Sequence, residues 1–156
     1  MGAVARVAPL LLLAVLPAAC SDTVDVDAGS PHGGTARACR ALVDALPDRV
    51  DDLDRRPVDD GDRYAAAWGD PAVTLACGVG RPHGFTATSQ CQNANGVDWY
   101  IPDQQLTGKP TDLTITAVGR SAYVRVELPK EYWPPANALV DLAPALKKLR
   151  SVRPCL

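Results

Sequence analysis

Two stretches of the chain repeat apolar side chains at the three-to-four-residue spacing of an amphipathic helix. The first begins near Thr35, whose hydroxyl suits an N-cap, and is stopped by Pro47; its apolar stripe is Cys39, Leu42, Val43 and Leu46. The second begins with Asp141 as N-cap and has Pro144 in its first turn; its apolar stripe is Leu142, Leu146 and Leu149. The pattern predicts one helix near each end of a folded domain.

Between these helices, apolar and polar residues alternate as they do in half-buried strands. Such alternation covers residues 72–79, 97–101, 113–118 and 122–128, with a weaker stretch at 85–89. A turn at 119–121 joins two of these strands into a hairpin, and Asn95-Gly96 is a second turn signal. The charged stretch 48–63 predicts a solvated loop or frayed helix, and 64–68 a short helical turn. We therefore expect an α+β fold, with an antiparallel sheet of about four to five strands and both helices packed on it.

The first 16 residues are almost wholly apolar apart from Arg6 and lead through Pro17 and two alanines to Cys20. A charged start, a short apolar core and small residues indicate a secretory signal, and a bilayer-spanning helix would need about 20 apolar residues. A cysteine in this place is where bacteria attach lipid, although lipoprotein signals usually have leucine where this chain has Pro17. We expect residues 1–19 to be a signal peptide and Cys20 to carry a fatty-acyl anchor of the palmitate type. Ordinary secretion after cleavage near Ala19 is the alternative.

The stretch that follows Cys20 is small, polar and rich in glycine, without a sustained apolar period. It predicts a lipid-anchored flexible tether over residues 20–36 and a single extracytoplasmic domain over residues 37–156. About 120 residues is an ordinary size for one domain. A random coil of about 16 residues spans roughly 20–25 Å, so we expect the domain to stay close to the membrane.

The chain has five cysteines, and lipidation of Cys20 leaves an even set in an exported domain. We therefore expect two disulfides that staple the fold. Of the three pairings that four cysteines allow, we favour Cys39–Cys155, which would join the first helix to the end of the chain, and Cys77–Cys91. Zinc binding is the alternative, but no Cys-x-x-Cys pair is present.

Four short motifs occur in order along the domain: Trp68-Gly69-Asp70-Pro71, Cys77-Gly78-Val79, Gly96-Val97-Asp98-Trp99 and Gly119-Arg120. With these motifs, its signal-like start and the cysteine near its end, the chain resembles a family of actinobacterial membrane lipoproteins known only as a domain of unknown function. The resemblance covers roughly residues 39–155. It implies location in the cell envelope and a compact lipid-anchored domain, and it brings no catalytic residues.

Candidate catalytic and metal-binding residues are sparse. His83 is the only histidine of the expected domain, and no Gly-x-Ser-x-Gly motif surrounds Ser89 or Ser121. The aspartates of 51–62 lack the spacing and the later glutamate of a calcium-binding loop. We expect no catalytic residues, no metal and no cofactor. A net charge of −2 gives no reason to expect a nucleic-acid partner.

The aromatic segment Tyr132-Trp133-Pro134-Pro135 lies between the last strand and the last helix. Exposed aromatic residues beside prolines can bind sugars, peptides or a partner protein. Tyr132 and Trp133 are therefore the candidate binding surface. The alternative is that Trp133 closes the hydrophobic core, because large aromatic side chains are mostly buried.

Together these patterns predict a non-enzymatic binding or accessory module, held by lipid on the outer face of the cytoplasmic membrane, with an envelope protein as partner. A small extracytoplasmic hydrolase acting on cell-wall material is one alternative, for which His83 is the main candidate residue. A purely structural envelope protein is the other.

Overall fold

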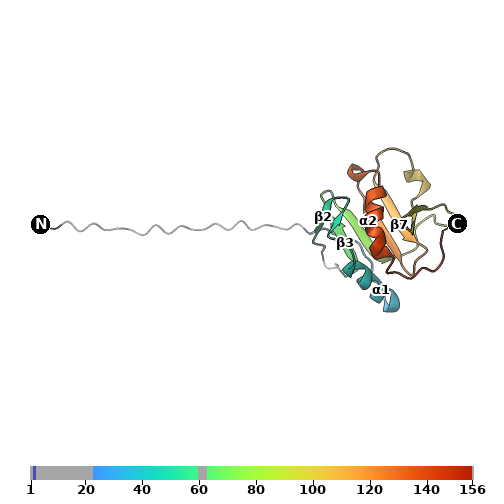
Figure 1. Ribbon diagram of the computed structural model, residues 1–156, viewed down its shortest axis with the longest axis horizontal. Helices are drawn as coiled ribbons and strands as arrows, with labels where there is room; N and C mark the ends of the chain where they lie inside the picture. The colour runs from blue at the N-terminus through green and yellow to red at the C-terminus, as the bar shows by residue number, and fades with distance from the viewer. Residues whose placement is uncertain (1, 3–22, 60–62, 156) are drawn as a thin grey trace.

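Two helices lie on one face of an eight-stranded antiparallel sheet (Figure 1). The structure is a computed structural model that describes residues 2, 23–59 and 63–155. The predicted α+β class is confirmed, whereas the expected four to five strands are too few. The expected signal peptide, apart from residue 2, and Cys20 lie outside the described residues.

The elements follow one another along the chain as α1 (Gly33–Asp44), β1 (Arg49–Val50), β2 (Leu53–Arg56), β3 (Ala65–Trp68), β4 (Val73–Val79), β5 (Gln92–Ala94), β6 (Val97–Tyr100), β7 (Leu113–Val118), β8 (Tyr123–Leu128) and α2 (Ala136–Leu146). Two short 3-10 helices, Asp103–Gln105 and Lys130–Tyr132, precede β7 and α2. The strand order across the sheet is β1-β2-β3-β4-β8-β7-β6-β5. Because every neighbouring pair is antiparallel, short turns can connect most of the strands.

The hairpin of β7 and β8 forms the centre of the sheet, as its alternation predicts. Ile115 lies opposite Val126 in the register, and both are fully buried. Successive side chains of a strand point to opposite faces. The inward side chains of β8 pack with those of β4, β6, β7 and the two helices in one hydrophobic core.

The residues of both predicted stripes are buried, although Leu46 and Leu149 lie beyond the ends of α1 and α2, and the starts of the helices also differ from expectation. Helix α1 begins at Gly33 rather than near Thr35, and its N-cap residue makes no side-chain capping hydrogen bond. Helix α2 begins at Ala136, five residues before the expected Asp141. Asp141 accepts a hydrogen bond from the backbone N–H of Asp51 (2.9 Å), so its carboxylate binds another part of the fold rather than capping the helix. Pro144 lies within α2, not in its first turn.

Three strands occur where the sequence predicts a charged loop and a helical turn. Strand β3 lies in the stretch 64–68, for which the sequence predicts a short helical turn, but all four residues of this strand are buried although alanine favours helices. Ala66 and Trp68 belong to the main core, whereas Ala65 packs with Ala28 on the other face. Small side chains let β3 lie between these two layers, so tertiary contacts override helix propensity. Strands β1 and β2 lie at the edge of the sheet, where charged side chains can remain in water.

The sequence prediction is also wrong for the stretches just before and just after Cys91. Residues 85–89 form turns rather than a strand, since Phe85 and Ser89 donate backbone hydrogen bonds three residues back. Strand β5 pairs with β6 across the expected Asn95-Gly96 turn, and both turn residues have positive φ. The sequence does not predict β5 because this strand has only three residues, which are largely polar and do not alternate with apolar ones.

The segment 23–31 is part of the domain rather than a flexible tether. Val24 forms a parallel bridge with Val58, and Ala28 is buried against β3 and β4. The carbonyl of Asp27 accepts a hydrogen bond from Arg125 on β8 (2.7 Å). The expected tether is therefore wrong for residues 23–36, and the domain includes Thr23 rather than beginning at residue 37; residues 20–22 lie outside the described part of the chain.

The two disulfides pair Cys39 with Cys77 and Cys91 with Cys155, so both favoured pairings are wrong. The first bond joins α1 to β4, with a Cα–Cα distance of 5.5 Å. Cys91 directly precedes β5, and three strands lie between β4 and β5. That separation is about 19 Å at the usual strand spacing, far beyond the roughly 7 Å that a disulfide can bridge. A second bond to Cys155 is possible because the C-terminal segment reaches β6, where the Cys155 N–H donates to Asp98.

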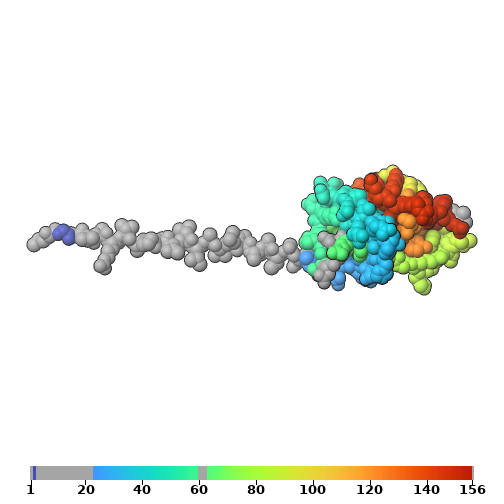
Figure 2. Space-filling view, turned by 90° about the horizontal axis from the view of Figure 1, so that it is seen from below, coloured from blue at the N-terminus to red at the C-terminus, as the bar shows by residue number. Residues whose placement is uncertain are grey.

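The two ends of the described domain lie on opposite sides of it. Val24 bridges Val58, just after β2, and Figures 1 and 2 show the C-terminal end on the side of the domain away from β2.

Candidate functional site

The outward face of β8 is the centre of the candidate site. Tyr123, Arg125 and Glu127 alternate with fully buried residues and point away from the helices. The segment 23–31 covers the neighbouring part of this face over β3 and β4. The loop 80–90 covers β6, where the rings of Phe85 and Tyr100 lie 5.1 Å apart. A strip over β7 and β8 remains between the two covers.

A basic hollow of about 430 Å³ lies at the Tyr123 end of this strip. It is lined by three arginines, two aromatic residues and a disulfide cysteine: Arg81, Arg120, Arg153, Phe85, Tyr123 and Cys155. The guanidinium of Arg81 donates twice to the Phe85 carbonyl, at 3.0 and 2.7 Å, and its charge lies over the Phe85 ring. Arg120 donates to the carbonyls of Gly96 (2.7 Å) and Leu149 (3.3 Å). These bonds fix two positive charges without neutralising them.

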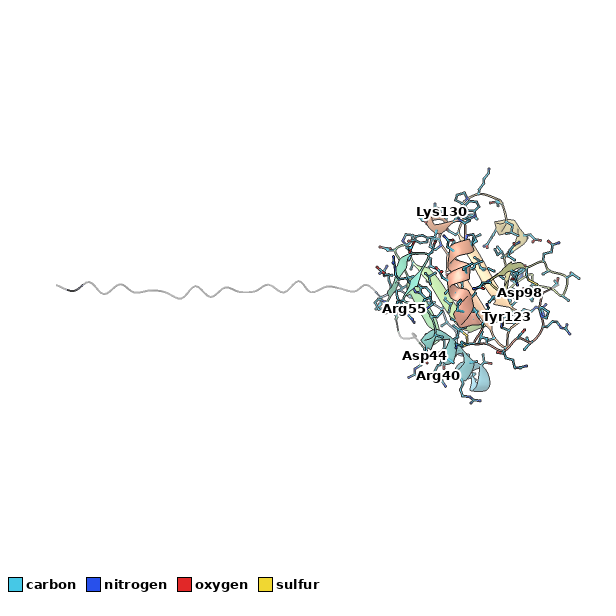
Figure 3. The ribbon with its side chains drawn as sticks, in the orientation of Figure 1. Arg40, Asp44, Arg55, Asp98, Tyr123 and Lys130 are labelled. Atoms are coloured by element: carbon cyan, nitrogen blue, oxygen red, sulfur yellow. A yellow bond between two sulfur atoms is a disulfide. The ribbon has the colours of Figure 1, made fainter. Side chains whose placement is uncertain are left out.

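The basic hollow exists because the C-terminal segment is fastened beside the β7–β8 turn. Val152 donates its backbone N–H to the carbonyl of Gly119, and Ser121 donates to Arg150. The Cys91–Cys155 bond ties the same segment to the chain before β5. Figure 3 places Tyr123 and Asp98 on this side of the molecule, and Asp98 accepts the Cys155 N–H at 3.0 Å.

A middle hollow of about 330 Å³ adjoins the basic hollow and shares Arg81 with it. Its other lining residues include His83, Tyr100, Thr114, Thr116 and Arg125. His83 is exposed in the loop, as predicted, and its carbonyl lies 3.5 Å from the Tyr100 hydroxyl. Among the described residues that line this hollow there is neither a serine nor an aspartate, so it does not assemble the triad that His83 would need.

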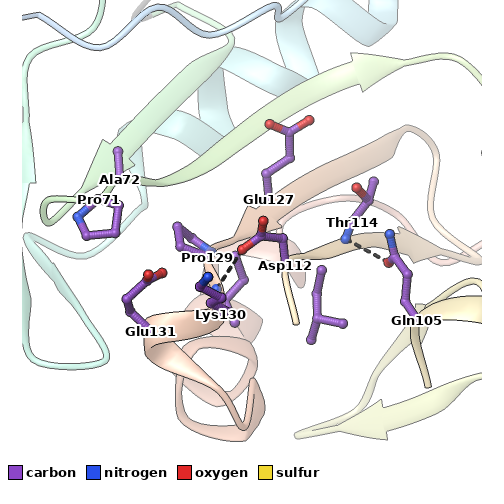
Figure 4. Close-up of a pocket in the computed structure, with 11 residues that line it drawn as sticks. Pro71, Ala72, Gln105, Asp112, Thr114, Glu127, Pro129, Lys130 and Glu131 are labelled. Carbon is purple, nitrogen blue, oxygen red and sulfur yellow. Dashed lines mark hydrogen bonds between the residues drawn. The ribbon is translucent and has the colours of Figure 1, made fainter. Parts of the chain in front are cut away.

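An acidic hollow of about 560 Å³ lies at the Glu127 end and shares Thr114 with the middle hollow (Figure 4). Three carboxylates line it, those of Asp112, Glu127 and Glu131, against the single ammonium of Lys130. The Asp112 carboxylate accepts the backbone N–H of Lys130 at 2.9 Å, which fixes its position. The basic, middle and acidic hollows thus form one trough along β8, with opposite charge at its two ends.

The aromatic residues singled out in the sequence lie elsewhere. Tyr132 is partly buried against the main core, and Trp133 is 37% exposed beside α2. Neither side chain lines the trough. Burial raises the pKa of the Tyr132 hydroxyl above its usual value, and the nearby Asp70 carboxylate adds repulsion against the phenolate.

No group of three or more histidine, cysteine, aspartate or glutamate side chains in residues 23–59 and 63–155 could hold a metal ion. No helix in the described part of the chain has the length and apolar character needed to cross a membrane.

The fold and site define a disulfide-stapled α+β domain with a charged trough on its sheet. The chain belongs to the family described as "Protein of unknown function (DUF3515)", whose model matches residues 1–154. No curated protein and no solved structure matches the chain.

Sequence reasoning missed the trough because its residues come from four distant segments. Arg81 and Arg153 lie 72 positions apart and share a hollow only through the fold. One signal was present, since Tyr123, Arg125 and Glu127 occupy alternate positions of a predicted strand whose other residues are apolar.

Proposed function

We propose that this protein is an actinobacterial envelope lipoprotein whose domain acts as a binding module on the outer face of the cytoplasmic membrane. The observation that carries the proposal is the pairing of cysteines. Two disulfides use four of the five cysteines, and Cys20 is the one cysteine that belongs to neither bond. Disulfides persist in oxidising, extracytoplasmic environments, and Cys20 follows a signal-like segment.

The ordered N-terminal segment makes this anchor much shorter than a 16-residue tether. Only Ser21 and Asp22 separate Cys20 from Thr23, whose hydroxyl donates to Asp59. Three Cα–Cα steps reach at most about 11 Å. A lipid on Cys20 would therefore hold the domain against the membrane, with the end around Thr23 nearest to it. The C-terminal segment, which lies on the opposite side in Figure 1, lines the basic hollow, so this hollow would face away from the membrane.

The role is binding because the trough offers fixed charges and concave surface along one strand. Anchoring confines such a site to a thin layer and raises its effective concentration for ligands in that layer. An envelope protein that presents a charged segment is the expected kind of partner.

Fatty-acid labelling of growing cells, followed by membrane fractionation, tests the anchor. The wild-type chain should incorporate label and remain in the membrane fraction, whereas Cys20→Ser should lose both properties. Ser21→Ala is the matched control and should keep both, because the cysteine is unchanged. An unlabelled, soluble wild-type protein would overturn the proposal.

A further inference from the structure

The trough has the dimensions of a short extended chain. Tyr123 and Glu127 are four residues apart on one strand, which corresponds to about 13–14 Å at the usual rise per residue. The three hollows along this row adjoin through Arg81 and Thr114, so their volumes form one path rather than three separate pits. About four residues of an extended peptide would fit this length.

The charges at the basic end select an anionic group. Arg81 and Arg120 are held by carbonyl oxygens, so their positive charges stay in place when the trough is empty. Arg153 is exposed and makes no hydrogen bond or ion pair through its guanidinium with the described residues. Guanidinium groups match the geometry of a carboxylate because they can donate two parallel hydrogen bonds to it. None of the described residues lining this hollow is acidic.

The charges at the other end select a cation. Glu127 is paired with Arg125, at 3.3 Å between Oε1 and Nε. Glu131 and Asp112 add two more carboxylates against one lysine. A uniformly anionic polymer would place negative charge on these carboxylates, which is unfavourable. A ligand with a negative charge at one end and a positive charge at the other can place the first beside the arginines and the second beside the carboxylates.

We propose that the trough binds an extended peptide whose free carboxyl terminus lies among the arginines and whose amine lies about four residues away at the acidic hollow. Phe85 and Tyr123 provide apolar surface for the side chain next to the carboxylate. This inference rests on the proposed binding function and adds the ligand class and its direction.

Isothermal titration of the full-length exported chain in detergent, with two synthetic peptides, tests the proposal. The probe is Lys-Ala-Ala-Ala with a free carboxylate, and the control is the same peptide with a C-terminal amide. We expect the free acid to bind at least tenfold more tightly than the amide. Arg153→Gln should remove most of this preference, whereas Arg37→Gln on the exposed face of α1 should leave it unchanged.

A second peptide pair tests the acidic end. In the second peptide, norleucine replaces the lysine of the probe and the amino terminus is acetylated, so both positive charges are lost. We expect this peptide to bind the wild-type chain more weakly than the probe does. The difference between the two peptides should be smaller in the Glu131→Gln variant. Equal affinity for acid and amide, no binding of either peptide, or competition by inorganic phosphate alone would overturn the peptide ligand. Fatty-acid labelling of Cys20 is measured independently, so a failure of the trough proposal is distinguishable from a failure of the anchor.

Discussion

A Cβ atom at Gly119 would lie 2.4 Å from the backbone carbonyl oxygen of Arg153. No real side chain makes so close a contact, and Gly119 also has φ +70°. The C-terminal segment can therefore lie beside the β7–β8 turn only because position 119 is glycine. That close approach forms one wall of the basic hollow.

Gly119→Ala should displace the C-terminal segment and weaken peptide binding. We expect the free energy of unfolding to fall by about 1–3 kcal/mol, since backbone strain and the steric clash act together. Urea denaturation measures the change. Gly108→Ala is the matched control, because Gly108 has the same φ of +70° but nothing within 4 Å of its added Cβ. Equal losses in both variants would show that the contact with Arg153 is unimportant.

The two disulfides should contribute to different properties. Removing Cys39–Cys77 by double serine substitution should lower the free energy of unfolding by about 2–5 kcal/mol, since this bond joins α1 to the central strands. Removing Cys91–Cys155 in the same way should loosen the basic hollow and abolish the preference for a free carboxylate. Denaturation and peptide titration of each double variant check this division.

Peptide mapping under non-reducing conditions checks the pairing itself. Fragments joining Cys39 to Cys77 and Cys91 to Cys155 are expected. A fragment joining Cys77 to Cys91 would contradict the arrangement of the sheet.

The ordered N-terminal segment predicts a packing effect on β3. Ala65 is fully buried against Ala28 and Ala76, so Ala65→Leu should force segment 23–31 away from the sheet. Overpacking of this kind costs about 1–3 kcal/mol. Ala41→Leu on the exposed side of α1 is the control and should change stability little. Limited proteolysis near residue 28 should speed up in the Ala65 variant only; unchanged cleavage would mean that the segment is not packed there.

Tyr132 predicts a loss of stability at high pH. Its pKa in the folded protein is raised by burial and by Asp70, so the fold binds this proton more tightly than the unfolded chain does. The stabilisation is fully present below the unfolded pKa of about 10 and is lost as the pH rises through the folded value. Wild-type protein should therefore lose more stability between pH 8 and pH 10.5 than Tyr132→Phe loses. Identical losses in urea titrations would contradict this.

The predictable parts of the fold are those in which local pattern and tertiary contacts agree. Strands β7 and β8 alternate clearly, and their turn lies where the glycine indicates. Strand β3 could not be predicted because its alanines pack against residues on both faces of the sheet. Those contacts come from distant parts of the chain, so the neighbouring residues in the sequence give no sign of them. Strand β5 gives no periodic signal because it is a short, polar edge.

The disulfide cysteines could be identified from their even number, but their pairing could not. Pairing depends on strand order, and β8 lies between β4 and β7 although it comes later in the chain. The same reason hid the trough, since Arg81 and Arg153 meet only after the sheet and the second disulfide have formed.

Intact-mass and N-terminal peptide analysis of the mature protein, extracted from its own membranes, tests the central claim most directly. We predict a chain that begins at Cys20, with that sulfur carrying a diacylglyceryl group and the other four cysteines in two disulfides. A mature chain that begins elsewhere, or that begins at Cys20 with an unmodified thiol, would contradict it.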